Sequence, residues 1–318
     1  MNTIPPQSTV PELRALIDIG TNSVKLLVAR VQGRSVNPIH EESEQTRLGR
    51  GFYETHVLQP EAIHDTIQAL IRFRDTARSL GAESIRVIAT SAARDAHNQP
   101  DLLRAAERSA DLRVEVISGE QEAEWVYQGV TSDPLFQGKR LLILDVGGGS
   151  TEFILGEGEH KQFRESVPLG SVRLLEQCPH SDPPTFAELS ACRSQVKEFI
   201  TKRVMPDVRV ALLGSGTPAQ LVGTGGAATI MGRVLLQLES FERDRLEGAV
   251  ILKSQVTELV SRFWSMPLVD RRRIVGLPKK RADVILTGAL IYEGVMEHLE
   301  FSELRISTRG LRFGGIHQ

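Results

Sequence analysis

The segment LLILDVGGGSTEFILGEG (residues 141–158) repeats a pattern found earlier in LIDIGTNSVKLLVARV (residues 16–31). In both, an apolar run leads to Asp, an aliphatic residue, Gly, two small or polar residues and Ser, and a second apolar run follows. Such runs on either side of a short polar turn are typical of paired β-strands. A unit that occurs twice predicts a duplicated domain with a cleft between the copies.

The rest of the chain alternates between strand and helix patterns. Further strands are predicted at residues 84–90, 113–118, 209–217 and 304–308, and helices at 61–81 and 281–300. This alternation indicates an α/β fold with largely buried sheets. A polar segment containing Pro and Gly, residues 131–140, predicts the boundary between the copies. We therefore expect a disordered tail over residues 1–13, a first domain over 14–130 and a second over 131–318.

The composition excludes several classes of protein. The 318 residues include 38 Lys and Arg against 40 Asp and Glu, a net charge of -2, so a globally basic nucleic-acid coat is excluded and no DNA partner is expected. Two cysteines are too few for a disulfide scaffold or a zinc ribbon. No apolar run approaches the ~20 residues that span a bilayer, and the N-terminal sequence is not a signal peptide. We expect a cytoplasmic protein without a membrane partner.

The strongest chemical signal is Asp145-Val-Gly-Gly-Gly-Ser150-Thr-Glu152. Successive glycines allow backbone N–H groups to form an anion-binding nest suited to phosphate. Asp145 ends a buried strand, where a metal ion or water would offset the cost of burying a carboxylate. The alternative is a glycine hairpin capped by Asp145, but the second occurrence of the motif favours the phosphate site. In the first copy Lys25 occupies the place of Glu152; it is either a phosphate ligand or a solvated charge on an edge strand.

Two acids follow the strand at 113–118. Ser118 and Gln121 form a Ser-x-x-Gln capping box, which predicts that a helix begins here. Glu120 and Glu122 flank opposite edges of its apolar stripe, and either could be a general base that reaches into a cleft. The alternative is that both acids only stabilise the first helical turn. Spacing does not choose between them.

Basic residues supply further candidate ligands. Arg94 follows a strand and several small residues, and a guanidinium binds phosphate oxygens in a bidentate manner. The segment RRRIVGLPKKR (271–281) holds six basic residues and no acid, so it predicts a patch for a polyanion or, alternatively, a solvated loop. Arg173, Arg309 and Arg312 are weaker candidates.

One competing motif indicates a different ligand. Gly214-Ser-Gly-Thr-Pro-Ala219 fits the dinucleotide fingerprint G-x-G-x-x-A and follows a predicted strand, but no acid lies about 20 residues further on. No Walker motif, H-E-x-x-H motif or paired-Cys motif occurs. A nicotinamide or flavin site is therefore disfavoured.

Seven motifs in order resemble the exopolyphosphatase/guanosine pentaphosphate phosphohydrolase (Ppx/GppA) family, from about Ala15 to Gly314. They are LIDIGTNSVKLLVARV, VIATSAAR, VEVISGEQEAEW, LLILDVGGGSTEFILGEG, VPLGSVRL, LLGSGT and RISTRGLRFG. The resemblance implies two duplicated actin-like (ribonuclease H-like) domains with an interdomain cleft. It implies that the chain lacks the extra C-terminal region of the family's longer members.

The resemblance also implies residue roles. Glu122 matches the acid that activates the attacking water, and the neighbouring Gln121 departs from the Glu of many members. Asp145 and Glu152 match the acids linked to Mg²⁺. The phosphate-binding positions of the family correspond to Asn22, Ser23, Lys25, Arg94, Gly147, Gly148, Gly149 and Ser150. Lys25 stands where some members carry an Arg. A weaker substrate patch is expected at Arg271, Lys279, Lys280 and Arg281.

The expected activity is Mg²⁺-dependent hydrolysis of the terminal phosphoanhydride of inorganic polyphosphate, with release of orthophosphate. One alternative is hydrolysis of guanosine pentaphosphate (pppGpp) at its 5′ end. Others are a non-catalytic sensor of either polyanion and a kinase or ATPase of the same fold. The family also suggests a homodimer.

Overall fold

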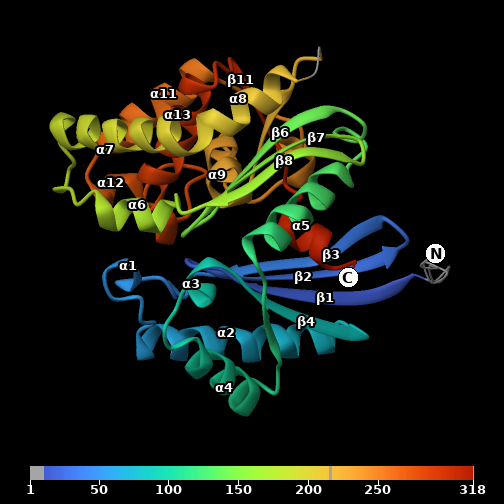
Figure 1. The fold of residues 1–318 in the computed structure, drawn as a ribbon. Helices are drawn as coiled ribbons and strands as arrows, with labels where there is room; N and C mark the ends of the chain where they lie inside the picture. Colours follow the sequence, from blue (N-terminus) through green and yellow to red (C-terminus); the bar gives the residue numbers. More distant parts are fainter. Residues whose placement is uncertain (1–10, 215–216, 318) are drawn as a thin grey trace.

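The computed structural model of the chain describes residues 11–214 and 217–317. The predicted tail lies outside the described residues up to position 10, and the first strand already begins at Glu12. Two mixed sheets, each with helices, form two lobes that face each other (Figure 1). This arrangement confirms the predicted α/β fold.

The first sheet has the strand order β3-β2-β1-β4-β5. The first three strands form an antiparallel meander, and β4 and β5 continue the sheet in parallel with β1. Their bounds are β1 (Glu12–Ile19), β2 (Val24–Gln32), β3 (Ser35–Glu44), β4 (Ser84–Ala89) and β5 (Val114–Val116).

The second sheet repeats this plan in the order β8-β7-β6-β9-β11-β10. An antiparallel meander again comes first, β9 lies parallel to β6 and β11 parallel to β9, and β10 closes the edge antiparallel to β11. The duplication predicted from two short motifs thus extends to the topology of the whole sheets. The bounds are β6 (Arg140–Val146), β7 (Thr151–Glu157), β8 (His160–Val167), β9 (Gln220–Thr224), β10 (Val250–Leu252) and β11 (Glu303–Ile306).

Helices cover the outer face of each sheet and fill the space between the sheets. The first sheet and its helices, here the first lobe, include α1 (Phe52–Thr55), α2 (Pro60–Ser79), α3 (Ser91–Arg94) and α4 (Gln99–Ala110). The second lobe includes α6 (Ser171–Gln177), α7 (Phe186–Phe199), the π-helical turn η1 (Ile200–Val204), α8 (Met205–Leu213), α9 (Gly225–Leu235), α10 (Arg243–Leu246), α11 (Lys253–Trp264), α12 (Leu268–Arg271), the 3₁₀ turn η2 (Lys279–Arg281) and α13 (Ile285–His298). Between the sheets lie α5 (Gly119–Thr131) and α14 (Leu311–Gly315).

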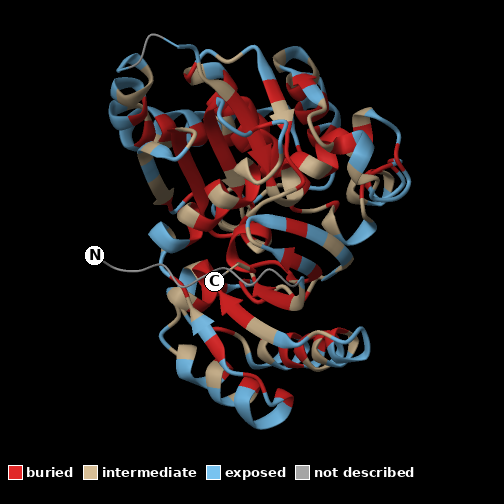
Figure 2. Ribbon diagram, turned by 90° about the vertical axis from the view of Figure 1, so that its right-hand side faces the viewer, coloured by how far each residue is buried: buried red, intermediate tan, exposed pale blue. Residues whose placement is uncertain are grey.

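Three apolar cores follow from these layers. One lies between the first sheet and α2 and α4, and a second lies between the second sheet and the helices of its lobe. The third joins α5 and α14 to the inner faces of both sheets, with Leu16 of β1 and Ile143 of β6 among its members. Figure 2 shows the resulting concentration of buried residues along the strands. Because the helices α5 and α14 belong to this shared core, each lobe depends on them.

The two helices between the sheets approach each other closely. A Cβ atom at Gly314 would lie 1.9 Å from the carbonyl oxygen of Trp125, and one at Gly129 would lie 2.1 Å from that of Gly310. Only glycine permits such contact between helix backbones. The backbone of helix α14 therefore packs directly against the backbone of α5.

Two connecting segments lie together beside the helices between the sheets. One follows α5, and the other leads from β11 to α14. Arg309 in the second connection forms an ion pair of 3.2 Å with Asp133 in the first and donates to Ser132 Oγ at 3.4 Å. The two connections are thus tied to each other.

The strand predicted at residues 209–217 is wrong, because residues 205–213 form helix α8. Pro206 occupies its first turn, and the helix continues α7 through the π-helical turn, so its apolar residues do not alternate between two faces of a sheet. The glycines of the dinucleotide fingerprint therefore follow a helix rather than a strand. Residues 215–216 of that motif lie outside the described residues. The helix predicted at 281–300 begins at Ile285, after the 3₁₀ turn.

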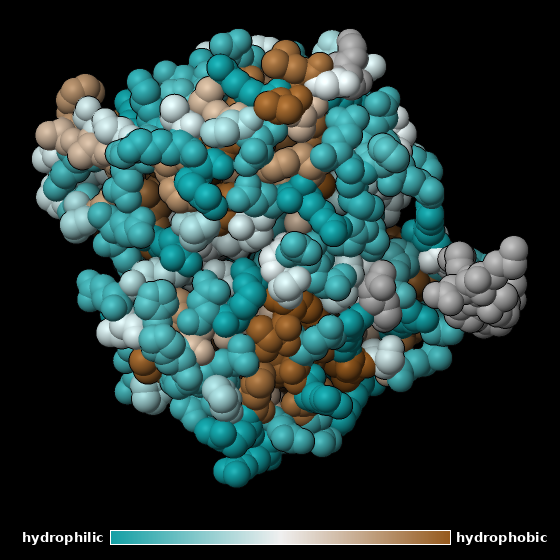
Figure 3. Space-filling model, viewed as in Figure 1, coloured by the Kyte–Doolittle hydropathy of each residue, from teal (hydrophilic) through white to brown (hydrophobic). Residues whose placement is uncertain are grey.

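The molecular surface is mainly hydrophilic on the face shown in Figure 3. Among the described residues, no helix has both the length and the apolar character that a membrane crossing requires.

Candidate active site between the lobes

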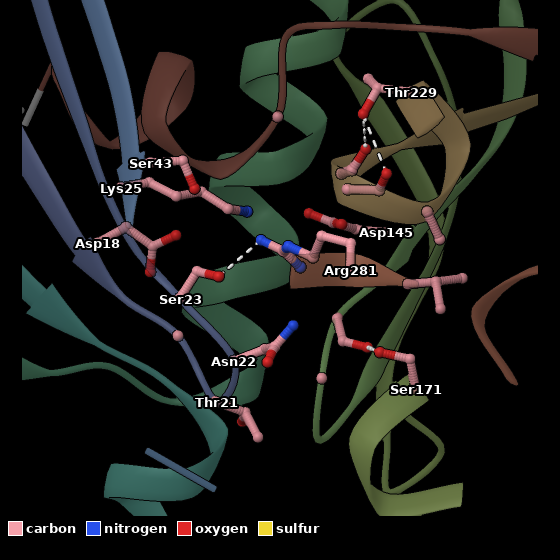
Figure 4. A pocket seen from close by; sticks show the side chains of 18 of the residues that line it. Asp18, Thr21, Asn22, Ser23, Lys25, Ser43, Asp145, Ser171, Thr229 and Arg281 are labelled. Carbon is pink, nitrogen blue, oxygen red and sulfur yellow. Dashed lines mark hydrogen bonds between the residues drawn. The ribbon is translucent and has the colours of Figure 1, made fainter. Parts of the chain in front are cut away.

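A cavity of about 770 Å³ separates the two Asp-containing loops. The loop after β1 lines one side and the loop after β6 lines the other, so Asp18 and Asp145 face each other across it (Figure 4). The predicted cleft between the two copies of the repeat is therefore present.

Both loops close with the same backbone hydrogen bond. Gly20 N–H donates to the Ser23 carbonyl at 3.0 Å, and Gly147 N–H donates to the Ser150 carbonyl at 3.0 Å. The sequence repeat is thus a repeat of backbone geometry.

The carbonyl groups of the three glycines in the second loop are all directed at α6. Gly147 O accepts from Ser171 N–H at 2.9 Å, Gly148 O accepts from Val172 N–H at 2.8 Å, and Gly149 O accepts from Arg173 Nε at 2.9 Å. In a trans peptide the N–H group points away from the preceding carbonyl. The N–H groups of Gly148, Gly149 and Ser150 therefore point away from α6, and within the described residues none donates to a protein acceptor. Three adjacent free donors at a cavity form a site for an anion.

In the first loop, too, carbonyl groups accept hydrogen bonds from the protein and the N–H groups after them point the other way. Thr21 O accepts from Gly49 N–H at 2.7 Å, and Asn22 O accepts from Arg47 N–H at 3.1 Å. The N–H groups that follow these carbonyls, on Asn22 and Ser23, are left without an acceptor in the described part of the chain. Asn22 Nδ2 is buried without a partner, so it is a further donor available to a ligand.

The cavity also holds four carboxyl groups, of which those of Asp18, Glu122 and Glu152 are buried and that of Asp145 is half-buried. Asp145 and Glu152 are direct cross-strand neighbours in the β6–β7 ladder. Burial raises the pKa of Asp145 to about 6 and that of Glu152 to about 7, and for Glu152 the charge of Asp145 adds to the effect. Burial also raises the pKa of Asp18.

Only one of the two acids on the first turn of α5 enters the cavity. Ser118 accepts from Gln121 N–H and caps the helix as predicted, and Glu122 then lies on the buried stripe while Glu120 is exposed. Burial and the charge of Glu152 raise the pKa of Glu122 well above its usual range, and the nearby guanidinium of Arg94 opposes this shift. The Arg94 guanidinium donates to Glu122 Oε2 at 3.1 Å and to the Ile117 carbonyl. Arg94 therefore contacts the candidate base rather than lining the cavity wall.

The predicted basic residues divide into two groups. Lys25 lines the cavity on β2, which is an inner strand of its sheet, and burial lowers its pKa. Lys279, Lys280 and Arg281 line the opposite wall, and Arg281 donates to Ser23 Oγ at 2.6 Å across the cleft.

Arg271 does not belong to this patch. Its side chain is buried beneath η2 and donates to the carbonyl groups of Phe263, Met266 and Ala282. Its hydrogen bonds hold the surrounding chain together, so the expectation that it contacts substrate is wrong.

A third glycine turn contributes to the cavity and was missed in the sequence. Thr224, Gly225 and Gly226 join β9 to α9 and line the cavity. A Cβ atom at Gly225, whose φ is +80°, would lie 2.2 Å from Asp145 Oδ1. The signal was present, because Gly223-Thr-Gly-Gly226 stands at the end of the short apolar run that forms β9.

The acids fit a Mg²⁺ ion that is held partly by substrate. In the described part of the chain no three His, Cys, Asp or Glu side chains converge to hold a metal by themselves. Mg²⁺, however, usually binds through one or two carboxylates, several waters and the phosphates of its substrate. Asp18 Oδ1 is buried and lacks a hydrogen-bond partner, and Asp145 and Glu152 offer further oxygen donors. The donor set is therefore suited to Mg²⁺.

Comparison with known proteins gives a consistent result. The model of the Ppx/GppA phosphatase family matches residues 27–318. Exopolyphosphatase 2 of Mycobacterium tuberculosis is 33% identical over 300 residues, which cover 90% of each chain. The guanosine-5′-triphosphate,3′-diphosphate pyrophosphatase of Aeromonas salmonicida is 29% identical over 96% of this chain, but the match spans 59% of that protein. The solved Aquifex aeolicus PPX-GPPA enzyme superposes with a TM-score of 0.77 at 30% identity, covering 97% of this chain and 100% of that one.

Proposed function

This chain belongs to the Ppx/GppA phosphatase family, and from that premise we propose that it is an exopolyphosphatase. It hydrolyses the terminal phosphoanhydride of inorganic polyphosphate and releases orthophosphate. The observation that supports this most directly is the pair of loops with free N–H donors on either side of a cavity that contains a buried carboxylate.

Glu122 is the general base. It accepts a proton from a water molecule, the water oxygen attacks the terminal phosphorus, and the bond from that phosphorus to the bridging oxygen breaks. A base is most effective when its pKa lies near the working pH. Burial moves the pKa of Glu122 in that direction, and the Arg94 guanidinium opposes the shift.

The two loops bind the terminal phosphate group of the substrate and the phosphate group next to it. The N–H groups of Gly148, Gly149 and Ser150 stabilise negative charge on phosphate oxygens, as do Asn22 and Lys25 from the first lobe. Preorganised donors of this kind require no rearrangement during the reaction.

Asp18, Asp145 and Glu152 would hold a Mg²⁺ ion in the cavity. When bound, the ion supplies positive charge to the phosphate oxygens. The acids also repel phosphate when no cation is present, so the residues themselves make productive binding depend on one.

Polyphosphate is favoured over pppGpp by the cavity wall. Lys279 and Lys280 are exposed at its rim and Arg281 lies inside, which suits a chain of repeating negative charge. The match to exopolyphosphatase 2 of Mycobacterium tuberculosis covers 90% of that protein, whereas the match to the Aeromonas salmonicida pyrophosphatase covers 59% of that one. Hydrolysis of pppGpp is the second candidate, because a relative with that activity in its name aligns with 96% of the chain.

The test compares turnover of the two substrates in Mg²⁺ under the same conditions. We expect the larger kcat/KM with polyphosphate, and a larger value with pppGpp would reverse the assignment. Glu122→Gln should lower phosphate release by about 10²–10⁴-fold. Glu120→Gln, on the same helical turn but exposed, should leave it unchanged. Equal rates for wild type and Glu122→Gln would remove Glu122 from its role, and tight binding without turnover would indicate a sensor.

The assembly and location belong to the same proposal. We expect a cytoplasmic homodimer whose subunits divide into domains at residues 131–140. Light scattering at several protein concentrations tests the oligomeric state, and a mass of one chain at all of them would contradict it.

A further inference from the structure

One carbonyl of the glycine loop is held by a side chain rather than by backbone. Gly147 O and Gly148 O accept from N–H groups of the α6 N-terminus, but Gly149 O accepts from Arg173 Nε at 2.9 Å. Rotation of the Gly149–Ser150 peptide would move the Ser150 N–H group, which is one of the three free donors. The orientation of that donor therefore depends on the Arg173 side chain.

Arg173 is in turn held by the opposite lobe. Its guanidinium carbon lies 4.2 Å from the centroid of the Tyr53 ring, and its Nη2 lies 3.4 Å from Asp95 Oδ2. Both partners belong to the first lobe, whereas Arg173 and Gly149 belong to the second. The Arg173 side chain is only 14% exposed, so these neighbours fix its position.

The same helix makes a second contact with the first lobe. Glu176 accepts from the N–H groups of Gly51 at 2.7 Å and Tyr53 at 3.3 Å. Tyr53 Oη also lies close to the loop, because a Cβ atom at Gly149 would be 2.3 Å from it. Tyr53 is therefore held at this junction by its backbone N–H and its ring face, and its hydroxyl group lies beside the glycine loop.

We propose that Arg173 is a positioning residue of the hydrolase, which orients the Gly149–Ser150 peptide toward the terminal phosphate only while Tyr53 and Asp95 of the first lobe hold its guanidinium. The proposal rests on the function proposed above and adds a coupling to it. When the lobes separate, Arg173 loses its partners and the anion site loses its order. Closure of the cleft and assembly of the phosphate site are then one event.

The first test measures kcat with polyphosphate for Arg173→Ala, Arg173→Lys and Tyr53→Leu. Loss of one oriented donor lowers kcat by about 10²–10³-fold, and we expect a loss of that order for Arg173→Ala. Lysine keeps the charge but cannot stack on Tyr53 and donate in the guanidinium plane, so Arg173→Lys should lose at least tenfold. Full activity of Arg173→Lys would overturn the proposal.

Two readouts separate positioning from a purely structural role. The double variant Arg173→Ala/Tyr53→Leu should be no slower than Arg173→Ala, because Tyr53 acts through Arg173, and additive losses would contradict this. Millimolar methylguanidine should restore part of the activity of Arg173→Ala, and a lack of rescue in a folded variant would count against the proposal. Urea unfolding midpoints of each variant establish that it is folded.

The matched control is Arg86→Lys. Arg86 also lies over an aromatic ring, 4.8 Å from the Trp125 centroid, and pairs with Glu115 at 2.6 Å, but it is outside the cavity. Its kcat should equal that of the wild type. A loss of kcat as large as that of Arg173→Lys would show that any weakened arginine–aromatic contact lowers turnover, whether or not it lies at the cavity.

Binding distinguishes failure of this inference from failure of the proposed function. Affinity for tripolyphosphate is measured by calorimetry in the Glu122→Gln background, where no turnover is needed. Arg173→Ala should weaken it about tenfold, and equal affinity would refute the positioning role even if the wild type hydrolysed polyphosphate. If the wild type hydrolysed neither polyphosphate nor pppGpp but the affinities differed as expected, the proposed function alone would fall.

Discussion

Replacing Gly314 by Ala tests whether the contact between α14 and α5 positions the catalytic helix. A Cβ atom at this position would lie 1.9 Å from the Trp125 carbonyl oxygen and 2.8 Å from Trp125 Cα. Both atoms are backbone, so neither can rotate away. The helices must separate by about 1.5 Å before this distance reaches the 3.4 Å of an ordinary van der Waals contact.

The cost is that of overpacking a close interface, about 1–3 kcal/mol. The better helix propensity of Ala offsets at most about 1 kcal/mol, and α14 spans only Leu311–Gly315. Because Trp125 and Glu122 lie on adjacent turns of α5, the displacement also reaches the proposed base. A misplacement of about 1 Å can lower turnover by about 10²-fold.

The assay combines urea unfolding with phosphate release from polyphosphate. We expect Gly314→Ala to have a lower unfolding midpoint at an unchanged m-value, and a kcat reduced at least tenfold. Gly214→Ala is the control, since a Cβ atom there would lie 3.6 Å from its nearest neighbour. If Gly314→Ala matched the wild type in both measurements, the helix contact would have no part in positioning Glu122.

Four further predictions concern charge. Because burial raises the pKa of Glu152 from 4.5 to about 7, the folded state holds its proton more tightly, and the free energy of unfolding of the metal-free protein should fall as pH rises between these values. Glu152→Gln should therefore gain about 1–3 kcal/mol at pH 8 and little at pH 4 in urea melts; an equal effect at both would contradict the assignment. Arg94→Gln removes the cation that opposes the raised pKa of Glu122, so the rising limb of kcat/KM against pH should move to higher pH rather than stay in place. Lys280→Gln should raise KM for long polyphosphate several-fold at low salt and change kcat little, and an unchanged KM would exclude the rim from binding. EDTA should abolish phosphate release and added Mg²⁺ restore it, whereas full activity in EDTA would exclude the metal.

The sequence predicted the parts of this molecule that depend on local pattern. The two Asp-containing turns, the strands around them and the cap at Ser118 were all identified from residues next to one another in the chain. The opposition of Asp18 and Asp145 followed from the repeat itself. These features need no knowledge of distant partners.

What the sequence did not predict depends on packing between distant segments. The apolar residues at 209–213 suit a strand or a helix equally, and only the continuation from α7 makes them helical. Arg271 looks like its basic neighbours in the sequence, but the carbonyl groups that bury it come from three separate positions. The spacing of Glu120 and Glu122 did not show which of them enters the cleft, and only the family resemblance selected Glu122. In the structure the two side chains differ in burial, since Glu122 is buried and Glu120 is exposed.

Arg309 links the two connecting segments through its contacts with Asp133 and Ser132. This link limits how the two lobes can move relative to each other. If the lobes move apart, a contact that spans the cleft, such as that of Arg281 with Ser23, must break. Under the proposed activity, a polymer that stays bound between successive cleavages would then be held by one lobe alone, and we expect the cations of η2 on the second lobe to hold it. The number of phosphates removed in one encounter would depend on the rim of that lobe.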